Sequence, residues 1–377
     1  MKEIAIFRNQ LFKNSESFIT NQAESIKKYN VVYVGRKVVG AKVVEQNVKT
    51  IKDADEDGFR AKELWNILSR DPYAYLRLLK ESNIELIHAH FAIDALYACE
   101  ISKKIGVPLV STLHGFDVTT RNIDFLKSRS PSWINYCFFS HRLKTRGDLF
   151  LCVSDFIKKK AIDAGFPESK LLKHYIGIKI DDVCSNEKKE KVILHVARLV
   201  EKKGTTYLID AIKKIENQLD GYIVKIVGNG PLFDELQSKI EVLGLKKHIE
   251  MLGEIPHDRV MQLIKTSSIL VVPSVTAKSG DSEGLPTVIL EASANQVPVI
   301  GTLHAGIPEA IVDEITGYIV GERDTDSLSE RIKILIQNDI KRESMGVNAR
   351  KLMCEKFNLD IQTNILENEY DRLINGK

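Results

Sequence analysis

Short apolar segments alternate with amphipathic segments along the whole chain, and this alternation is the strongest constraint on its fold. The apolar segments are five to eight residues long, and most are followed by helical patterns of about 10 to 16 residues. Nearly continuous apolar strands separated by helices are typical of parallel sheets that are covered on both faces. The predicted strands are residues 3–7, 31–35, 84–90, 108–114 and 149–154 in the first half, and 192–199, 222–228, 249–253, 268–274 and 298–302 in the second.

A polar stretch, DDVCSNEKKEK (181–191), divides the strands into two series and suits a linker. The length of 377 residues is too great for one ordinary core and fits two domains. We therefore predict an α/β fold of two doubly wound, Rossmann-like domains that face a cleft. The predicted divisions are residues 1–185, residues 186–360 and a C-terminal helix, 361–377, that packs on the first domain. Open α/β sheets bind ligands beyond the carboxyl ends of their strands, so functional residues are expected there.

The composition argues against several classes of protein. A formal net charge of +3 is close to neutral, so no nucleic acid is expected as a partner. The chain contains no run of about 18 apolar residues and begins without the apolar segment of a signal peptide, so a cytoplasmic protein is expected. Its five cysteines are odd in number and lack metal-binding spacing, which favours reduced, buried thiols.

Two glutamates, Glu283 and Glu291, lie on either side of a predicted helix start in the segment SGDSEGLPTVILEASANQVPVIG (279–301). Proline is favoured in the first turn of a helix, so the helix is expected to begin near Leu285 or Pro286. The free amides and the dipole of a helix start favour a bound anion. The amides expected to point out of this helix start are those of Gly284, Leu285 and Thr287.

This arrangement fits a nucleoside diphosphate sugar. A phosphate at the helix start would have one carboxylate on its loop side and another roughly 7.5 Å along the helix. Carboxylates accept hydrogen bonds from the paired hydroxyls of sugars, so the donor sugar is predicted at Glu283 and the ribose at Glu291. The alternative is that Glu283 only balances the helix dipole and that Glu291 is a solvated helix residue.

Two cations lie at the end of another predicted strand and just beyond it. In HVARLVEKKGTTYLIDAI (195–212), Arg198 and Lys203 precede a glycine and a predicted helix. An arginine and a lysine at such a turn could neutralise a diphosphate without a metal ion. Gly230, in VGNGPLFDEL (227–236), is a further candidate for the donor site. The alternatives are a solvated cationic turn and a glycine that serves only a tight turn.

Histidines occur at the ends of two predicted strands in the first half. His114, in STLHGFDVT (111–119), is placed to donate to a sugar hydroxyl or to carry a proton, with a structural role as the alternative. The pair His88 and His90 in HAHF resembles a metal pair, but we expect the two rings on opposite faces of the strand. No metal site is therefore expected there.

Five segments that reach from the end of the first half through the second together resemble the family 4 glycosyltransferases, which have the two-domain GT-B fold. They are residues 154–172, 195–204, 227–232, 281–292 and 304–320, in the order and spacing of that family. The glutamate pair matches the family's E-x7-E signature. In the first half, ELIHAHF and VPLVSTLHGFD match the family more loosely, and NSESFITNQAESI is similar to the branch that makes bacterial exopolysaccharide, colanic acid and O-antigen.

The resemblance implies a retaining transferase that moves a hexose from a UDP- or GDP-sugar to a glycan or glycolipid acceptor, with no cofactor and no metal. The leaving phosphate is then expected to take the acceptor's proton. Residue by residue, the resemblance assigns the ribose to Glu291, the sugar hydroxyls to Glu283, the diphosphate to Arg198 and Lys203 with the amides of residues 284–287, and the side of the transferred sugar to His114.

The chain departs from the family at two places. Many members have a Gly-Gly turn after the first strand, but FRNQLFKNSESF (7–18) contains no glycine. The acceptor contact expected of Ser15, Glu16 and Ser17 therefore lacks that support. Lys179 stands where the family commonly has an aspartate, which is expected to serve as a hinge or a cap rather than in chemistry.

Residues 127–146, KSRSPSWINYCFFSHRLKTR, interleave four aromatic residues with cations. Such a segment predicts a peripheral contact with the cytoplasmic face of the inner membrane, and hence a lipid-linked acceptor. The alternative is an ordinary helix with core aromatics. Two other functions remain open, namely a nucleotide-sugar epimerase or hydrolase and a catalytically silent partner subunit that binds nucleotide. The four aromatic residues are Trp133, Tyr136, Phe138 and Phe139.

Overall fold

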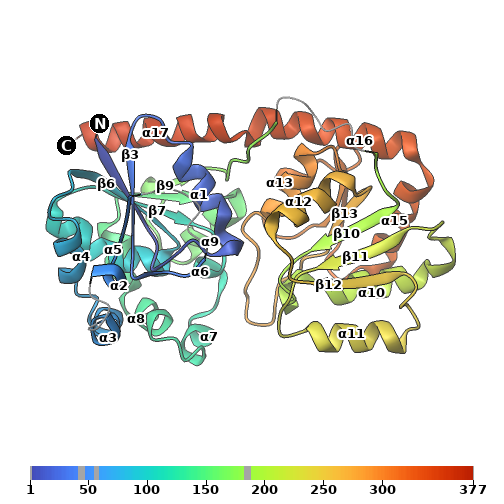
Figure 1. Cartoon of the computed structure of the whole chain (residues 1–377), viewed down its shortest axis with the longest axis horizontal. Coiled ribbons are helices and arrows are strands. Elements are labelled where there is room, and N and C mark those ends of the chain that lie inside the picture. Colours follow the sequence, from blue (N-terminus) through green and yellow to red (C-terminus); the bar gives the residue numbers. More distant parts are fainter. Residues whose placement is uncertain (1, 41–46, 55–58, 182–187, 377) are drawn as a thin grey trace. The chain divides into compact units, whose positions relative to one another are not determined.

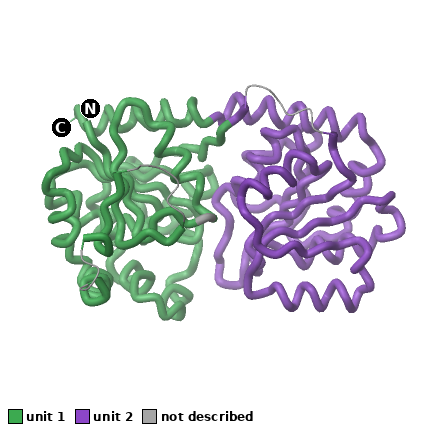
Figure 2. Tube along the Cα trace, viewed as in Figure 1, with its two compact units in different colours: residues 1–179, 359–377 green, residues 180–358 purple. Residues whose placement is uncertain are grey.

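A computed structural model of the protein describes residues 2–40, 47–54, 59–181 and 188–376. The chain divides into two compact units (Figure 2). Unit 1 contains Met1–Lys179 and Leu359–Lys377, and unit 2 contains Ile180–Asn358. The boundary predicted after residue 185, most of the predicted linker and Cys184 lie outside the described residues. The roles assigned to the two domains remain predictions.

Within the described residues, unit 1 is built on seven parallel strands in the order β5-β3-β1-β6-β7-β8-β9 (Figure 1). The chain starts in the middle of the sheet at β1, continues outward, and returns to the other side of β1 with β6. The carboxyl ends of β1 and β6 therefore form a switch point, where open α/β sheets bind ligands. The strands are β1 (Glu3–Phe7), β3 (Asn30–Gly35), β5 (Asn47–Thr50), β6 (Ile84–His90), β7 (Leu109–Leu113), β8 (Leu149–Cys152) and β9 (Leu171–Lys173), beside a two-stranded ribbon of β2 (Gln10–Leu11) and β4 (Lys37–Val38).

The last helix of the chain, α17 (Leu359–Asn375), belongs to unit 1. Its Glu367 accepts hydrogen bonds from the backbone N–H groups of Lys27 and Lys28 at 2.7 and 2.6 Å. Its Tyr370 is fully buried, and the Oη atom lies 2.5 Å from Nδ1 of His88. These contacts attach the end of the chain to the first sheet. The other helices of unit 1 are α1 (Ser17–Glu24), α2 (Ile51–Ala54), α3 (Phe59–Ser69), α4 (Tyr73–Leu78), α5 (Ala92–Ile105), α6 (Phe116–Thr119), α7 (Asn122–Lys127), α8 (Pro131–Arg146) and α9 (Asp155–Asp163).

The described part of unit 2 contains six parallel strands in the order β12-β11-β10-β13-β14-β15. This is the Rossmann order, and its switch point lies between β10 and β13. Helices α12, α13 and α16 pack together on one face of the sheet, and α10 and α15 pack on the other (Figure 1). The strands are β10 (Val192–Val196), β11 (Ile223–Val227), β12 (Ile249–Gly253), β13 (Ile269–Val272), β14 (Val299–Thr302) and β15 (Gly317–Val320). The helices are α10 (Thr205–Lys214), α11 (Phe233–Val242), α12 (His257–Thr266), α13 (Thr287–Ala294), α14 (Ile307–Ala310), α15 (Thr325–Gln337) and α16 (Asp339–Leu352).

The central strands are buried, as their continuous apolar sequences predict. Ile193 and Leu194 in β10 and Val271 in β13 are 0% exposed, and they face helices on both sides of the sheet. Full burial of one such side chain contributes about 1.5–3 kcal/mol to folding. All ten predicted strands are present, and the predicted fold of two Rossmann-like domains is confirmed.

The strands that the sequence did not predict lie mostly at the edges of the sheets. Strands β5 and β9 end the sheet of unit 1, and β15 ends the sheet of unit 2. Their sequences are NVKT, LLK and GYIV, each only three or four residues long. Edge strands are short and often polar because one side has no neighbouring strand. A criterion based on continuous apolar runs therefore does not detect them.

Candidate functional site

The switch point of unit 2 brings together the loop after β10 and the loop after β13, which are about 80 residues apart in sequence. Gly204, just before α10, has a positive φ of 65°, and a Cβ here would lie 1.8 Å from the carbonyl oxygen of Pro273. Only glycine permits this approach. Beside it, the N–H of Val275 donates to the carbonyl of Lys202 at 2.8 Å. The backbone thus fixes the two loops against each other.

Lys203 and Glu283, both predicted site residues, form an ion pair at this point, with Nζ and Oε1 2.8 Å apart. Lys202 pairs in the same way with Asp281 at 2.9 Å. Glu283 is 7% exposed. Burial alone would raise the pKa of Glu283, but the charges of Lys203 and Lys202 outweigh it and lower that pKa to about 2. Glu283 is therefore an ionised hydrogen-bond acceptor at neutral pH and not a proton donor.

Helix α13 begins at Thr287, so the predicted start at residue 285 or 286 is one or two positions early. Pro286 precedes the helix with an extended backbone. Glu291, inside the helix, is half-buried, and its carboxylate makes no hydrogen bond or ion pair with the described residues. Burial raises the pKa of Glu291, and the charge of His257 partly opposes this effect. Hydroxyl donors from a ligand would stabilise such a carboxylate.

Arg198 and Gly230 lie on neighbouring loops at the same edge of the sheet. The N–H of Leu199 donates to the carbonyl of Asn229 at 2.9 Å, and a Cβ on residue 230 would lie 2.4 Å from the Leu199 carbonyl oxygen. Backbone packing alone therefore accounts for Gly230. The Arg198 side chain is exposed and makes no hydrogen bond or ion pair within the part of the chain that the structure describes, so its guanidinium is accessible to an anion.

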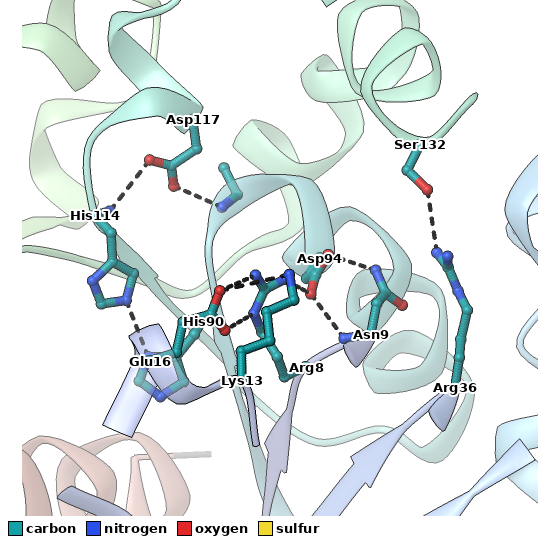
Figure 3. Close-up of polar contacts among 11 residues, drawn as sticks. Arg8, Asn9, Lys13, Glu16, Arg36, His90, Asp94, His114, Asp117 and Ser132 are labelled. Atoms are coloured by element: carbon teal, nitrogen blue, oxygen red, sulfur yellow. Dashed lines mark hydrogen bonds and ion pairs between the residues drawn. The ribbon is translucent and has the colours of Figure 1, made fainter. Parts of the chain in front are cut away.

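The switch point of unit 1 contains a buried cluster of charged groups (Figure 3). The Arg8 guanidinium follows β1 and donates to both carboxylate oxygens of Glu16, at 2.9 and 2.8 Å, and to Asp94. Burial opposes the charge on Arg8, but the carboxylates of Asp94 and Glu16 outweigh it and raise the pKa of Arg8. Glu16, expected to contact the acceptor, is therefore engaged within unit 1. Ser15 is exposed, and Ser17 is half-buried at the start of α1.

His114 belongs to a row of three histidine rings. Its Nε2 lies 3.1 Å from Nδ1 of His90 (Figure 3), and the His90 ring stacks on His88 with the centroids 4.4 Å apart. The expectation that His88 and His90 face opposite sides is wrong, because residues two apart in a strand share a face. Burial lowers the pKa of all three rings well below the ordinary value, so they are neutral at pH 7. Among the described residues, no three His, Cys, Asp or Glu side chains are grouped to hold a metal ion.

Comparison with known proteins identifies the family. Glycosyl transferases group 1 matches residues 179–352, and Glycosyltransferase Family 4 matches residues 30–181. An uncharacterized glycosyltransferase of Methanocaldococcus jannaschii is 30% identical over 275 residues, which are 73% of this chain and 72% of that protein. The chain belongs to the family 4 glycosyltransferases.

Two further comparisons support this assignment, a relative in sequence and a solved structure in fold. An Escherichia coli K12 protein assigned as the colanic acid biosynthesis glycosyltransferase WcaL is 29% identical over 293 residues, 76% of this chain and 69% of that protein. The crystal structure of HepE from Anabaena in complex with UDP and glucose matches with a TM-score of 0.76 at 17% identity, over 99% of this chain and 100% of HepE. The GT-B fold and the family predicted from the sequence are confirmed.

In this glycosyltransferase the aromatic and basic segment 127–146 lies largely in α8, and most of its aromatic residues pack within unit 1. Trp133 stacks on a phenylalanine ring with centroids 5.4 Å apart, Tyr136 is 5% exposed, and an arginine lies 3.7 Å from the centre of the Phe139 ring. Phe138, in contrast, is 63% exposed. The alternative of ordinary packed aromatics therefore describes three of the four. None of the described helices has the length and apolar character needed to cross a membrane.

Three residues of the unit 2 site had no role assigned from the sequence, namely Lys202, Asp281 and His304. Lys202 and Asp281 pair across the same two loops as Lys203 and Glu283, and this repeat of opposite charges is visible in EKKG and DSEG. His304 gives no such signal. Its contact with Glu283 exists only because the loop after β14 folds back onto that residue.

Proposed function

We propose that this glycosyltransferase moves a hexose from a nucleoside diphosphate sugar to a hydroxyl of a growing surface glycan, with retention at the anomeric carbon and without a metal ion. The observation that carries the proposal is the ion pair between Lys203 and the buried Glu283 at the switch point of unit 2. A cation and an ionised carboxylate held side by side suit a ligand that joins a phosphate to a sugar.

Each charged residue of the site is assigned to a different part of the donor. Glu283, with its low pKa, accepts hydrogen bonds from sugar hydroxyls. Lys203 and the accessible guanidinium of Arg198 take the diphosphate, with the amides at the start of α13. Glu291, whose carboxylate makes no hydrogen bond or ion pair within the described residues, accepts from the ribose hydroxyls. HepE has the same fold, and its crystal structure contains UDP and glucose, which supports a nucleotide sugar as the donor.

The proposed reaction breaks the bond between the anomeric carbon and the diphosphate. The sugar becomes oxocarbenium-like, and the cations of the site stabilise the negative charge that develops on the leaving phosphate. We assign no carboxylate as a nucleophile on the far face of the sugar, which double displacement would need. The departing phosphate instead takes the proton of the attacking hydroxyl on the same face, which retains the configuration. The neutral His114 ring donates to a hydroxyl of the transferred sugar.

The acceptor that we propose is a lipid-linked glycan of a surface polysaccharide. The name of the relative WcaL, a glycosyltransferase of colanic acid biosynthesis, supports a polysaccharide product. Ser15, in the short turn before α1, and Ser17, at the start of α1, remain candidates for the acceptor side because Glu16 is held by Arg8.

Nucleotide binding tests the proposal directly. Thermal unfolding is measured with UDP, GDP, ADP and CMP, each with and without EDTA, for the wild type and for Glu291→Ala. A ligand at about 100 times its dissociation constant stabilises the folded protein by about 2.7 kcal/mol, which for domains of this size raises the midpoint by roughly 5–10 °C. We expect such a shift with one diphosphate, unchanged by EDTA and lost in Glu291→Ala.

The outcome separates the rival functions. If none of the four nucleotides raises the midpoint, the donor site is refuted. If a nucleotide binds but neither its sugar conjugates nor any glycan acceptor is turned over, a silent partner subunit is the better description. Conversion of the donor without an acceptor would instead indicate an epimerase or a hydrolase.

A membrane contact of unit 1 gives a second prediction. On α3, Leu64, Trp65 and Leu68 are 56%, 62% and 55% exposed, and α3 packs on α8, where Phe138 is exposed. Burying one such side chain in lipid is worth about 1.5–3 kcal/mol, so Trp65→Ser should weaken binding to phosphatidylglycerol vesicles by about tenfold or more. Val242→Ser, on the 86% exposed residue of α11, is the control and should change nothing. A wild type that does not sediment with these vesicles would refute the contact.

A further inference from the structure

His304 lies just beyond β14, and both of its ring nitrogens are occupied. His304 is 2% exposed. The backbone N–H of Glu283 points at Nε2, 3.2 Å away, and the Oε1 atom of Glu322 lies 2.7 Å from Nδ1. The ring thus joins the backbone of the sugar-binding glutamate to a second carboxylate.

Chemistry fixes the tautomer of this ring. A backbone N–H can only donate, so Nε2 of His304 must be the bare, accepting nitrogen. The single ring proton is then on Nδ1, where it is donated to Glu322. A ring protonated on both nitrogens would set one N–H against another and lose the bond to Glu283.

Glu322 holds the other end of the same loop. Its carboxylate accepts from the backbone N–H of Thr276 at 3.0 Å and from the Thr276 hydroxyl at 3.1 Å. Thr276 and Glu283 begin and end the segment 276–283, so Glu322 and His304 together anchor both of its ends. On the far side of Glu283, the N–H of Gly306 donates to the carbonyl of Gly284 at 3.1 Å.

We propose that His304, oriented by Glu322, is a positioning residue that sets where the Glu283 carboxylate meets the donor sugar. The inference rests on the proposed function, because it assigns the sugar to Glu283. The Lys203 ion pair acts on the end of the Glu283 side chain, whereas the bond to the Glu283 N–H fixes the backbone from which that side chain extends. His304 acts through Glu283 and does not itself contact the donor.

Two conservative variants separate the two nitrogens of the ring. In His304→Gln, the amide oxygen can take the place of Nε2 and accept from the Glu283 N–H. In His304→Asn, the shorter amide can reach only Glu322. His304→Ala removes both bonds. The readout is the affinity for a nucleoside diphosphate compared with the affinity for its glucose, galactose and mannose conjugates, measured by calorimetry with the diphosphate that stabilises the wild type.

We expect all three variants to bind the bare diphosphate like the wild type. His304→Asn and His304→Ala should lose about tenfold in affinity for the sugar conjugate, and His304→Gln should keep most of it. Equal losses in all three variants, or no loss in any, would overturn the inference. A ring that only fills space would not make His304→Gln differ from His304→Asn. Thermal midpoints of the variants show whether each is folded.

A second measurement does not depend on the donor. In protein with ¹⁵N-labelled histidine, the ring signals of His304, identified by their loss in His304→Gln, should report a protonated Nδ1 and a bare Nε2. The opposite tautomer would refute the inference. If no nucleotide binds to the wild type, the proposed function fails, while the tautomer and the Glu283 amide shift in His304→Ala still decide whether the ring anchors this residue.

Discussion

Replacing Lys203 with alanine is expected to lower the free energy of unfolding by about 3 kcal/mol at pH 7. Glu283 is 7% exposed, and Lys203 is its ion-pair partner at 2.8 Å. Removing one member of a buried pair leaves the other charge without compensation, which commonly costs about 3–5 kcal/mol. Lys202 remains nearby and keeps the expected loss at the lower end. The same change should reduce sugar transfer by about 10²–10³-fold, since a group that stabilises developing charge is lost.

The loss of stability depends on pH in a direction that the pKa fixes. Folding lowers the pKa of Glu283 from its ordinary value of 4.5 to about 2. A carboxylate with a lowered pKa stabilises the folded state above its unfolded pKa, and this stabilisation disappears as the pH falls through the folded pKa. The difference between the wild type and Lys203→Ala should therefore be full at pH 7 and shrink between pH 4.5 and pH 2.

Denaturant unfolding at several pH values measures this difference. Lys213→Ala provides the control, because Lys213 and Glu216 form a pair whose side chains are 41% and 27% exposed. Such a surface pair is worth less than about 1 kcal/mol. If Lys203→Ala loses no more stability than Lys213→Ala, or loses the same amount at every pH, then Lys203 does not compensate the buried charge of Glu283.

The fold could be predicted because central parallel strands are buried on both faces. Segments such as VILHVARL and SILVVPS must be almost entirely apolar to occupy that place, so their sequence alone reveals them. The edge strands have a free side and need no such composition, which is why NVKT was not predicted. Helix starts were placed less accurately, since proline is accepted both within the first turn and just before it, as Pro286 shows.

The candidate site could be predicted only in part, for a related reason. Strand ends and helix starts place individual residues such as Lys203 and Glu283 at the edge of the sheet, and the sequence shows these signals. Which groups then touch depends on the course of the loops between them. The partner of Glu283 across 80 residues, the contact of His304 with its N–H and the capture of Glu16 by Arg8 all depend on that course. The sequence contained the residues but not their pairing.

Replacing Arg8 with methionine is expected to lower the free energy of unfolding by about 3–5 kcal/mol. Arg8 is 8% exposed and bonds both oxygens of Glu16 as well as Asp94 (Figure 3). Without it, the buried carboxylate of Asp94 and the largely buried carboxylate of Glu16 lose their shared cation, and Lys13, 3.7 Å from Glu16 and partly exposed, compensates only one of them. Arg8→Lys should recover only part of the loss, because an ammonium group cannot make the bidentate contact of the guanidinium with the Glu16 carboxylate.

Denaturant unfolding again provides the measurement, with Arg121→Met as the matched control. Arg121 pairs with Asp124 at 2.8 Å, but its side chain is 59% exposed, so a change of less than about 1 kcal/mol is expected. An Arg8→Met variant within about 1 kcal/mol of the wild type would show that the cluster is not a stabilising unit.

Neutralising the whole cluster extends the test to function. Arg8→Met combined with Glu16→Gln and Asp94→Asn removes the cation and both carboxylates, so most of the lost stability should return. If sugar transfer returns with it, Glu16 serves the scaffold of the unit 1 switch point and not the acceptor. If stability returns while transfer does not, the Glu16 carboxylate itself must contact the acceptor, as its sequence motif first suggested. The bidentate bond to Arg8 favours the first result, because both oxygens of the Glu16 carboxylate already accept hydrogen bonds and are less available to a hydroxyl of the acceptor.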